Sequence, residues 1–326
     1  MRTFALAAIA AGVNAISDME FEYMQYVAKF AKNHHNVEEF AIRLANFIKT
    51  HEAIEEINAT ESHTAGHNQF SDWHASEYKA MLGYKADPNV DVVKRIHHFD
   101  ESRNDSYVNW VEAGAVTDVK DQGQCGSCWS FSSTGSIEGA HFVATGELLS
   151  FSEQQLVECS HGLLGNHGCN GGLQTYAYQY YESHYAELEE VYPYTSGNGK
   201  ADYSNCSYDE KSKTAVEVSG FVNVTPSNPT QMKSALTTAP LAVAIEADKM
   251  VFQTYTSGVL SSSKCGTNLD HAVLVVGDGM EDGQEYWLVK NSWNTTWGDQ
   301  GYIKLAKDSS SGTCGVQLDP QLPTTN

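Results

Sequence analysis

The sequence predicts an α+β fold in which a helical segment comes first, a helical lobe follows, and antiparallel strands complete the chain. Three observations favour this order. Apolar residues recur at spacings of three and four over residues 16–82, as in amphipathic helices. Most glycines and all seven cysteines lie after residue 104. Short apolar runs separated by glycine-containing turns, typical of antiparallel strands, occupy roughly the last 90 residues.

Composition limits the architecture and the partners. With 326 residues, 41% of them hydrophobic, the chain can form one two-lobed domain with additional segments. The formal net charge is −21, and the part from residue 104 onward has 10 basic and 26 acidic residues, a balance of −16. So acidic a surface argues against nucleic acid and anionic membranes as partners. Two explanations of the charge stay open, solubility and function in an acidic compartment.

The N-terminus has the pattern of a secretory signal peptide. Arg2 supplies positive charge, residues 4–11 are apolar, and Val13 and Ala15 form a small-residue cleavage site, so we predict a cut after Ala15. A buried helix is the alternative, against which the cleavage site weighs. No later stretch approaches the ~20 apolar residues of a membrane span. Export to the secretory pathway, with a lysosome, an acidic vacuole or the extracellular space as destination, favours disulfides. Glycosylation triplets, individually weak signals, begin at Asn58, Asn104, Asn205, Asn223 and Asn294.

Helices and strands are expected in the following order. Two helices, the second longer than the first, are predicted within residues 16–82. Residues 83–103 contain Pro88, the dibasic pair Lys94-Arg95 and few large apolar side chains, which predicts an extended linker. Later helices are expected from Cys128 and over residues 173–181. Strands are expected at 241–245, 272–276, 286–289 and 302–305, with turns at 278–279, 282–283 and 298–301.

The segment QGQCGSCWSFS, residues 122–132, carries the strongest chemical signal. The bare spacing of Cys125 and Cys128 also occurs in redox pairs and zinc sites. A redox pair would precede a helix in a βαβ unit and zinc would require a second ligand pair, and the sequence offers neither. The flanking Gln122 and Trp129 favour a nucleophilic cysteine, without metal or cofactor. A helix start and a neighbouring imidazolium lower the pKa of a thiol, which suits Cys128 as a thiolate.

His271 is the candidate base among 13 histidines. It lies 143 residues after Cys128 and heads an apolar run, so it can face a cleft while the strand behind it is buried. Considered alone, such a histidine is more often structural. Twenty residues later comes Asn291-Ser292-Trp293. The Asn291 side chain can accept a hydrogen bond from the imidazole without adding charge, and Trp293 can cover that bond.

The CGSCW segment around Cys128, with His271 and the NSW triplet after it, resembles the papain-like cysteine proteases, most closely their cathepsin L-like branch. The resemblance implies a papain-like two-lobed fold, with a helical left lobe, an antiparallel β-barrel right lobe and a cleft between them. It implies a cysteine endopeptidase that hydrolyses peptide bonds in proteins through a thioester on Cys128. The oxyanion donors would be the Gln122 side chain and the Cys128 N–H. Asn294 departs from the family pattern, which has glycine there.

The number of cysteines is consistent with one free thiol that serves as the nucleophile. An odd number of cysteines in an exported protein suggests three disulfides and one thiol, and six cysteines allow fifteen pairings. Among these, the resemblance selects Cys125–Cys169, Cys159–Cys206 and Cys265–Cys314.

The resemblance also implies a substrate-binding set. It combines glycines that pair with a bound peptide and the walls of the main specificity pocket. The set is Gly171, Gly172, Leu173, Gln174, Ala244, Asp270, Ala272, Trp293 and Asp319. Asp319 would form the pocket floor, where an acid accepts arginine as well as aromatic side chains. An orientation of Asp319 toward solvent is equally open at this point.

Two motifs before residue 83 resemble the inhibitory propeptide of cathepsin L-like enzymes. Residues 39–58 match its helical pattern, with Thr50 in place of an asparagine, and Glu39 and Arg43 there are i,i+4 partners. Residues 66–72, GHNQFSD, match the second motif completely. The resemblance implies an autoinhibited zymogen, and we expect it to open when acid protonates carboxylates such as Asp72.

The implied propeptide tail, residues 83–103, would run backward through the cleft. The predicted boundaries are 1–15 for the signal peptide, 16–103 for the propeptide and 104–326 for the peptidase domain.

Two other functions compete with an endopeptidase. A catalytically inactive homologue acting as a binding protein is disfavoured by the intact set of Gln122, Cys128, His271 and Asn291. An exopeptidase would need a loop that blocks the cleft, and residues 159–169 are too short for one of the cathepsin B kind. The expected partners are protein and peptide substrates, the chain's own propeptide and cystatin-type inhibitors, and the protein is expected to be monomeric.

Overall fold

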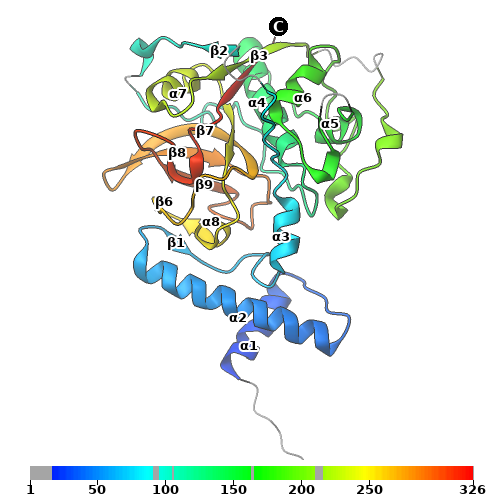
Figure 1. Ribbon diagram of the computed structural model, residues 1–326, viewed down its shortest axis with the longest axis vertical. Coiled ribbons are helices and arrows are strands. Elements are labelled where there is room, and N and C mark those ends of the chain that lie inside the picture. The colour runs from blue at the N-terminus through cyan, green and yellow to red at the C-terminus, as the bar shows by residue number, and fades with distance from the viewer. Residues whose placement is uncertain (1–16, 91–94, 105, 163–164, 210–215, 326) are drawn as a thin grey trace, which may run out of the picture.

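The computed structural model describes residues 17–90, 95–104, 106–162, 165–209 and 216–325. The predicted signal peptide and Lys94 of the dibasic pair lie outside these ranges. Two lobes lie side by side, with α1 (Asp18–Lys29) and α2 (Val37–Thr60) beneath them (Figure 1). Helix α3 (Ala75–Met81) leads from these helices to the junction of the lobes. No helix within the described ranges is long and apolar enough to cross a membrane.

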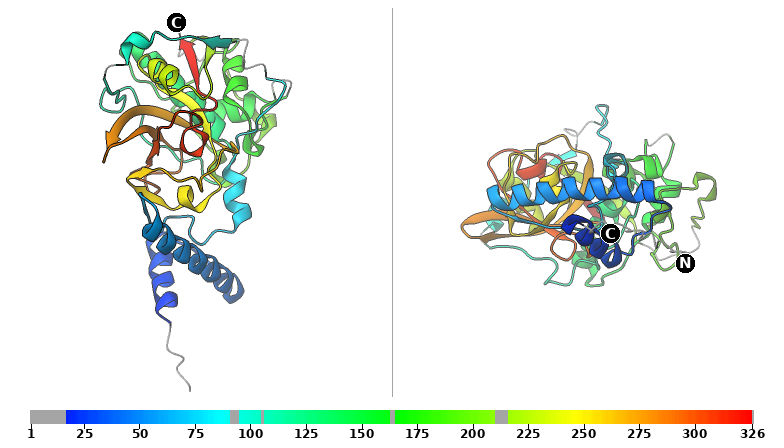
Figure 2. Two further views of the ribbon diagram at one scale, coloured as in Figure 1. Left: turned by 60° about the vertical axis from the view of Figure 1, so that its left-hand side comes forward. Right: turned by 90° about the horizontal axis from the view of Figure 1, so that it is seen from below.

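Helices α1 and α2 cross and share a small aromatic core, and Figure 2 shows them below the lobes. Helix α1 starts with a capping box, because Ser17 Oγ accepts from the Glu20 N–H and the Glu20 carboxylate accepts from the Ser17 N–H. Tyr23, Tyr26 and Phe47 are buried between the two helices. The two helices predicted before residue 83 are therefore present.

The helical pattern expected up to residue 82 is interrupted after α2. Strand β1 (Thr64–Ala65) pairs antiparallel with β5 (Tyr255–Ser257) of the right lobe. Asn68 Nδ2 donates to the Gln253 carbonyl at 2.7 Å. Because this backbone finds its partners in the right lobe and in local side chains, it does not continue the helix.

The left lobe is built on α4 (Cys128–Thr145), which lies between the two lobes and is buried from Cys128 to His141. Glycine ends this helix, since Gly146 has φ 79°, a left-handed conformation that few other residues adopt. The remaining helices of this lobe are α5 (Glu153–Cys159) and α6 (Gln174–Tyr181). The helices expected from Cys128 and over residues 173–181 are thus present.

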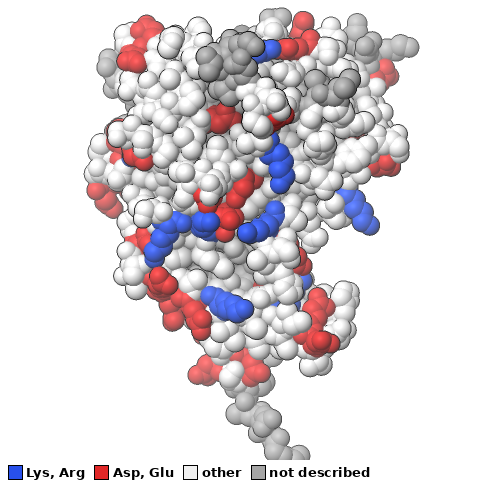
Figure 3. Space-filling model, viewed as in Figure 1, with Lys and Arg blue, Asp and Glu red and all other residues white. Residues whose placement is uncertain are grey.

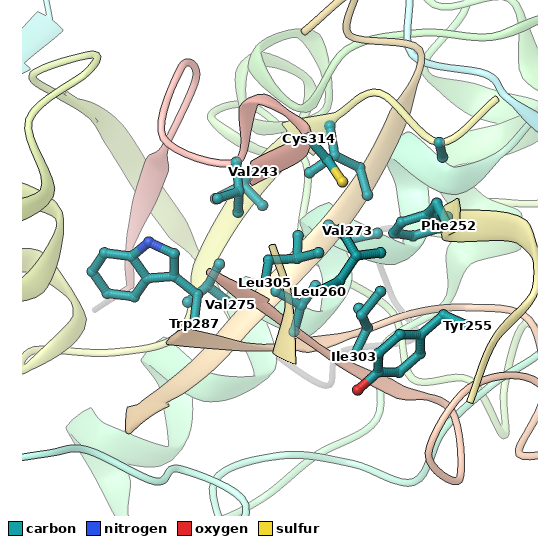
Figure 4. Packing of buried hydrophobic residues seen from close by; sticks show 14 of the residues in the cluster. Val243, Phe252, Tyr255, Leu260, Val273, Val275, Trp287, Ile303, Leu305 and Cys314 are labelled. Atoms are coloured by element: carbon teal, nitrogen blue, oxygen red, sulfur yellow. The ribbon is translucent and has the colours of Figure 1, made fainter. Parts of the chain in front are cut away.

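The right lobe is an eight-stranded sheet with the order β2-β3-β10-β4-β7-β8-β9-β6. Helices α7 (Pro229–Leu236) and α8 (Met250–Gln253) accompany it. The strands are β2 (Ile96–His97), β3 (Val218–Val224), β4 (Leu241–Ile245), β6 (Val259–Leu260), β7 (His271–Glu281), β8 (Gln284–Lys290), β9 (Tyr302–Ala306) and β10 (Gln321–Thr325). Side chains from β4, β7, β8 and β9 interdigitate in its core, as Figure 4 shows for Val243, Val273, Trp287 and Ile303.

Two expectations about this lobe need correction. The sheet is not a closed barrel, because its end strands β2 and β6 are two residues long and are not hydrogen-bonded to each other within the described chain. Residues 278–279 lie inside β7 rather than in a turn. The Asp278 carboxylate is buried between Lys233 and Lys307, at 2.6 and 2.7 Å, which holds this point of the strand inside the lobe. The turn at 282–283 is present between β7 and β8.

Three disulfides brace the lobes: Cys125–Cys169, Cys159–Cys206 and Cys265–Cys314. Cys128 is the free cysteine. Figure 3 shows one face of the molecule, on which acidic side chains are spread over the propeptide and both lobes and basic side chains lie mainly in the middle.

Candidate active site

Cys128 is the first residue of α4, and its thiol is fully buried. Two glycines and a disulfide shape the loop before it. Gly126 donates its N–H to the Cys169 carbonyl at 3.0 Å, next to the Cys125–Cys169 bridge. The helix dipole at this position favours a negative charge on the sulfur, which is the form that attacks a carbonyl.

His271 is the first residue of β7, across the cleft from Cys128. Its Nε2 lies 2.8 Å from Asn291 Oδ1, so the ring donates from Nε2. Its Nδ1 has no hydrogen-bond partner among the described atoms. Trp293 stacks on the imidazole with ring centroids 4.5 Å apart, and excludes water from the His271–Asn291 bond. This arrangement holds the ring in one tautomer with Nδ1 available for a proton.

Gln122 is held by the right lobe although it belongs to the left. Its Oε1 accepts from Ser292 Oγ at 2.7 Å and from Trp293 Nε1 at 3.1 Å. Because Oε1 accepts both of these bonds, the amide is oriented with its Nε2 toward the nucleophile loop. Nε2 donates to the Met81 carbonyl of the propeptide at 2.9 Å and to the Cys125 carbonyl at 2.8 Å. A backbone carbonyl thus already occupies the position that an oxyanion would need.

The propeptide passes directly over the nucleophile. A Cβ added at Gly83 would lie 1.8 Å from the Gly126 carbonyl oxygen, so only glycine fits there. The Gly172 N–H donates to the Gly83 carbonyl at 2.8 Å, and the Lys85 N–H donates to the Gly172 carbonyl at 3.1 Å. Residues 83–85 therefore pair with the turn that contains Gly171 and Gly172, here called the glycine turn, in the way an extended peptide would.

Burial under the propeptide sets the protonation of the catalytic pair. It raises the pKa of the Cys128 thiol to about 11, against smaller opposing contributions from backbone N–H groups. Burial also lowers the pKa of His271 to about 4, against the hydrogen bond with Asn291. Both groups are neutral between these values. Burial in this covered site therefore disfavours the thiolate–imidazolium pair, because both charged forms would be desolvated.

The comparisons with known proteins agree with this geometry. Residues 105–324 match the model of the papain family cysteine proteases. The chain belongs to the papain family of cysteine proteases. Residues 23–78 match the cathepsin propeptide inhibitor domain (I29). The protein is thus a cysteine endopeptidase carrying an inhibitory propeptide, a zymogen that propeptide removal activates.

Several relatives match almost the whole protease. Digestive cysteine proteinase 1 of Homarus americanus is 40% identical over 309 residues, which cover 92% of this chain and 93% of that protein. Cathepsin L of Sarcophaga peregrina is 39% identical over 349 aligned positions, with 99% and 100% coverage. The solved structure of digestive procathepsin L2 from Tenebrio molitor larval midgut superimposes with a TM-score of 0.84 at 34% identity, covering 94% of this chain and 99% of that one.

The predicted pocket of the protease is occupied by Tyr84. Its N–H donates to the Asp270 carbonyl at 3.0 Å. Its ring belongs to the buried cluster that also contains Leu173, Ala244 and Ala272. Its hydroxyl donates to Asp319 Oδ2 at 2.8 Å. Asp319 therefore points inward toward the propeptide ring in this structure, and not to solvent.

Gln174, predicted as a wall of the pocket, is held by hydrogen bonds from both lobes. Its side chain is fully buried, and Nε2 donates to the Val243 carbonyl at 3.0 Å and to Ser132 Oγ at 3.3 Å. The amide thus finds its partners at the junction of the lobes. Gly171 has φ 109°, and an added Cβ there would lie 2.6 Å from the Gly83 carbonyl, so it contacts the propeptide.

Sequence reasoning missed several residues that shape the site of the protease. Tyr84 and Gly83 lie in a segment interpreted as linker, and the glycine directly followed by a tyrosine was the available signal. Ser292 was visible within the NSW triplet, but its bond to Gln122 depends on the approach of two lobes.

No group of three or more potential metal ligands occurs in the described part of the chain.

Proposed function

We propose that four side chains share the reaction. Cys128 attacks the peptide carbonyl, and the oxyanion is held by Gln122 Nε2 and the Cys128 N–H. His271 gives its Nδ1 proton to the leaving amine, and then takes a proton from the water that hydrolyses the thioester. Asn291 keeps the ring in place throughout. The observation that carries this proposal is the Gln122 donor already bound to a backbone carbonyl beside the nucleophile.

The reaction requires the propeptide to leave. Without its cover, the thiol and imidazole regain water, and the helix dipole and their mutual attraction favour the charged pair. The test of this function is hydrolysis of a fluorogenic peptide by the acid-processed protein, with Cys128→Ala as the control. We place the mature N-terminus near Asn104 and the signal-peptide cut after Ala15, to be checked by N-terminal sequencing of the secreted and processed forms.

Acid activation is supported by two buried parts of the propeptide. Asp72 accepts a hydrogen bond from the Tyr26 hydroxyl at 2.9 Å and pairs with Lys32 at 3.0 Å, bonds that protonation of the carboxylate would weaken. His67 stacks on Phe47 with centroids 4.1 Å apart, and its Nε2 lies 3.1 Å from Nδ1 of His51. Burial and the neighbouring charges of His51 and Lys29 lower the pKa of His67 to about 4.

His67→Phe is expected to shift the pH of half-maximal processing downward by about 0.5–1 unit. The folded pKa of His67 lies below its unfolded value, so its stabilising neutral form is complete above about pH 6.5 and is lost as the pH falls toward 4. Glu22 and Glu55 lie 3.8 and 3.6 Å from His51, and their negative charges partly offset the repulsion between His51 and a protonated His67. Processing is followed by gel after acidification, with the exposed His35→Phe as matched control. Equal midpoints for both variants would remove His67 from the mechanism.

We further propose that Asp319 lets the pocket accept arginine as well as aromatic side chains at the second residue before the scissile bond. The inward carboxylate and its bond to Tyr84 support this. Asp319→Ala is expected to reduce turnover of an arginine substrate at least about tenfold relative to a phenylalanine substrate. Only the ionised carboxylate pairs with a guanidinium, so the arginine preference should grow as the pH rises through the titration of Asp319. The exposed Asp282→Ala serves as control, and an unchanged Arg/Phe ratio in Asp319→Ala would refute the assignment.

The three disulfides support folding in the secretory pathway. We propose a monomer that resides in a lysosome or acidic vacuole, or outside the cell, and that cystatin-type inhibitors recognise once the cleft is open. Among the glycosylation triplets, Asn223 is buried in β3, whereas Asn294 is exposed. We therefore expect a glycan at Asn294 and none at Asn223, to be read from the peptide masses after deglycosylation.

A further inference from the structure

The propeptide has a further contact surface, apart from both the cleft and the pairing of β1 with β5. After passing the nucleophile, the chain reappears at residues 95–104 on the opposite side of the molecule from α1 and α2, beside β3 and α7 (Figure 1). Strand β2 pairs there in parallel with β3, with Ile96 opposite Asn223 and His97 opposite Val224. This segment therefore extends the sheet of the protease by one strand.

The arginine of this segment is held by two different contacts. Arg95 Nη1 lies 2.8 Å from the Glu182 carboxylate. The Arg95 guanidinium carbon also lies 4.3 Å from the centroid of the Phe221 ring, a cation–π distance. Phe221 is only 5% exposed in the zymogen. Glu182, at the end of α6, and Phe221 of β3 thus present a carboxylate and an aromatic face to one basic side chain.

Four residues after Arg95, the backbone of Phe99 is held by the side chain of a glutamine from α7. Gln231 Oε1 accepts from the Phe99 N–H at 2.8 Å, and Gln231 Nε2 donates to the Phe99 carbonyl at 3.1 Å. Gln231 belongs to α7 and is itself 6% exposed. The Phe99 ring packs against the main core cluster. Beyond it, Asn104 is bonded at 3.0 Å to Ser234 Oγ of the same helix.

We infer that β3, Glu182 and the Gln231 side chain form a second peptide-binding site, distinct from the catalytic cleft. Its ligand is an extended strand with an arginine followed, four positions later, by an aromatic residue, and its occupant is the propeptide's own segment 95–103. The part docked in the cleft and the part docked at β3 then reinforce each other, since each raises the effective concentration of the other. A cut between them leaves the β3-bound part docked and still joined to the peptidase domain, and a second cut near residue 104 is needed before it can dissociate.

The first test uses the full-length chain with Cys128→Ala, so that no processing occurs. Amide hydrogen exchange is compared among the parent, Glu182→Gln and Gln231→Ala, with Glu190→Gln as an exposed acidic control in the same lobe. Exchange at residues 96–97 and in β3 is expected to accelerate about tenfold in the first two variants, since each loses charge-assisted or paired hydrogen bonds. Exchange in α1–α3 should not change. Unaltered exchange at 96–97 and β3 in both variants would overturn the second site.

The second test separates this site from the cleft. A fluorescent peptide of residues 95–104 is titrated into processed enzyme whose Cys128 has been alkylated, and anisotropy is measured. Saturable binding is expected, weakened about tenfold in Glu182→Gln and in a peptide carrying Arg95→Gln, with no additional loss when both are combined. Absence of saturable binding, or competition by a cleft-occupying inhibitor, would refute an independent site. Peptide hydrolysis by Glu182→Gln should equal that of the parent enzyme, so a failure here leaves the proposed catalytic roles untouched.

Discussion

Replacing Cys128 with alanine is expected to reduce peptide hydrolysis by the acid-treated protein at least about 10⁴-fold. No other free thiol occurs among the described residues, and the oxyanion donors alone cannot form the thioester. The measurement is hydrolysis of a fluorogenic peptide after processing of the variant by added wild-type enzyme, which is then removed. Unfolding temperature and intact disulfides serve as controls of the fold. Activity within tenfold of the wild type would show that another group attacks the substrate.

The same thiol provides a pH test of the propeptide's effect. Because burial raises the pKa of Cys128 to about 11 in the zymogen, the reactive thiolate is scarce below that pH. Alkylation of the intact zymogen by iodoacetamide should therefore be slow at neutral pH and accelerate only toward pH 11. In the processed enzyme, alkylation should already be fast in mild acid. Equal rates for both forms at neutral pH would show that the propeptide neither covers the thiol nor suppresses its ionisation.

Gly83→Ala is expected to release the propeptide from the cleft. The added Cβ would meet the Gly126 carbonyl at 1.8 Å, and neither backbone can retreat because both are hydrogen-bonded to the glycine turn. Overpacking of this kind costs about 3 kcal/mol, which raises the open fraction about a hundredfold. We expect a corresponding gain in peptide hydrolysis by the unprocessed zymogen at neutral pH.

The matched control for this variant is Ala86→Val, which enlarges an exposed side chain in the same segment. Short assays with gel analysis separate activity of the intact zymogen from activity of processed enzyme. If Gly83→Ala stayed as silent as Ala86→Val, the close approach of Gly83 to the nucleophile loop would not be what holds the propeptide in place.

The pattern of apolar residues along the sequence determined much of the secondary structure of this protein. Spacings of three and four predict α1, α2 and the helix that begins at Cys128, because each buries one face or lies wholly inside the protein. Apolar runs predict β4, β7, β8 and β9 for the same reason. The short helices α5 and α7 were not predicted, because their stability comes from caps and tertiary contacts rather than from a long apolar stripe. The continuation of β7 past Asp278 depends on two lysines that are remote in sequence.

The candidate catalytic residues were likewise visible as residue types in motifs, since Cys128, His271 and Asn291 are chemically distinctive and stand in recognisable contexts. Tertiary structure alone decided how they act in the zymogen. The neutral state of the thiol and imidazole follows from desolvation by a propeptide that no local pattern places over them. The inward turn of Asp319, the burial of the Gln174 amide between the lobes and the docking surface at β3 likewise depend on which groups far apart in the chain meet. Sequence determines such groups, but only folding determines their partners and their exposure to water.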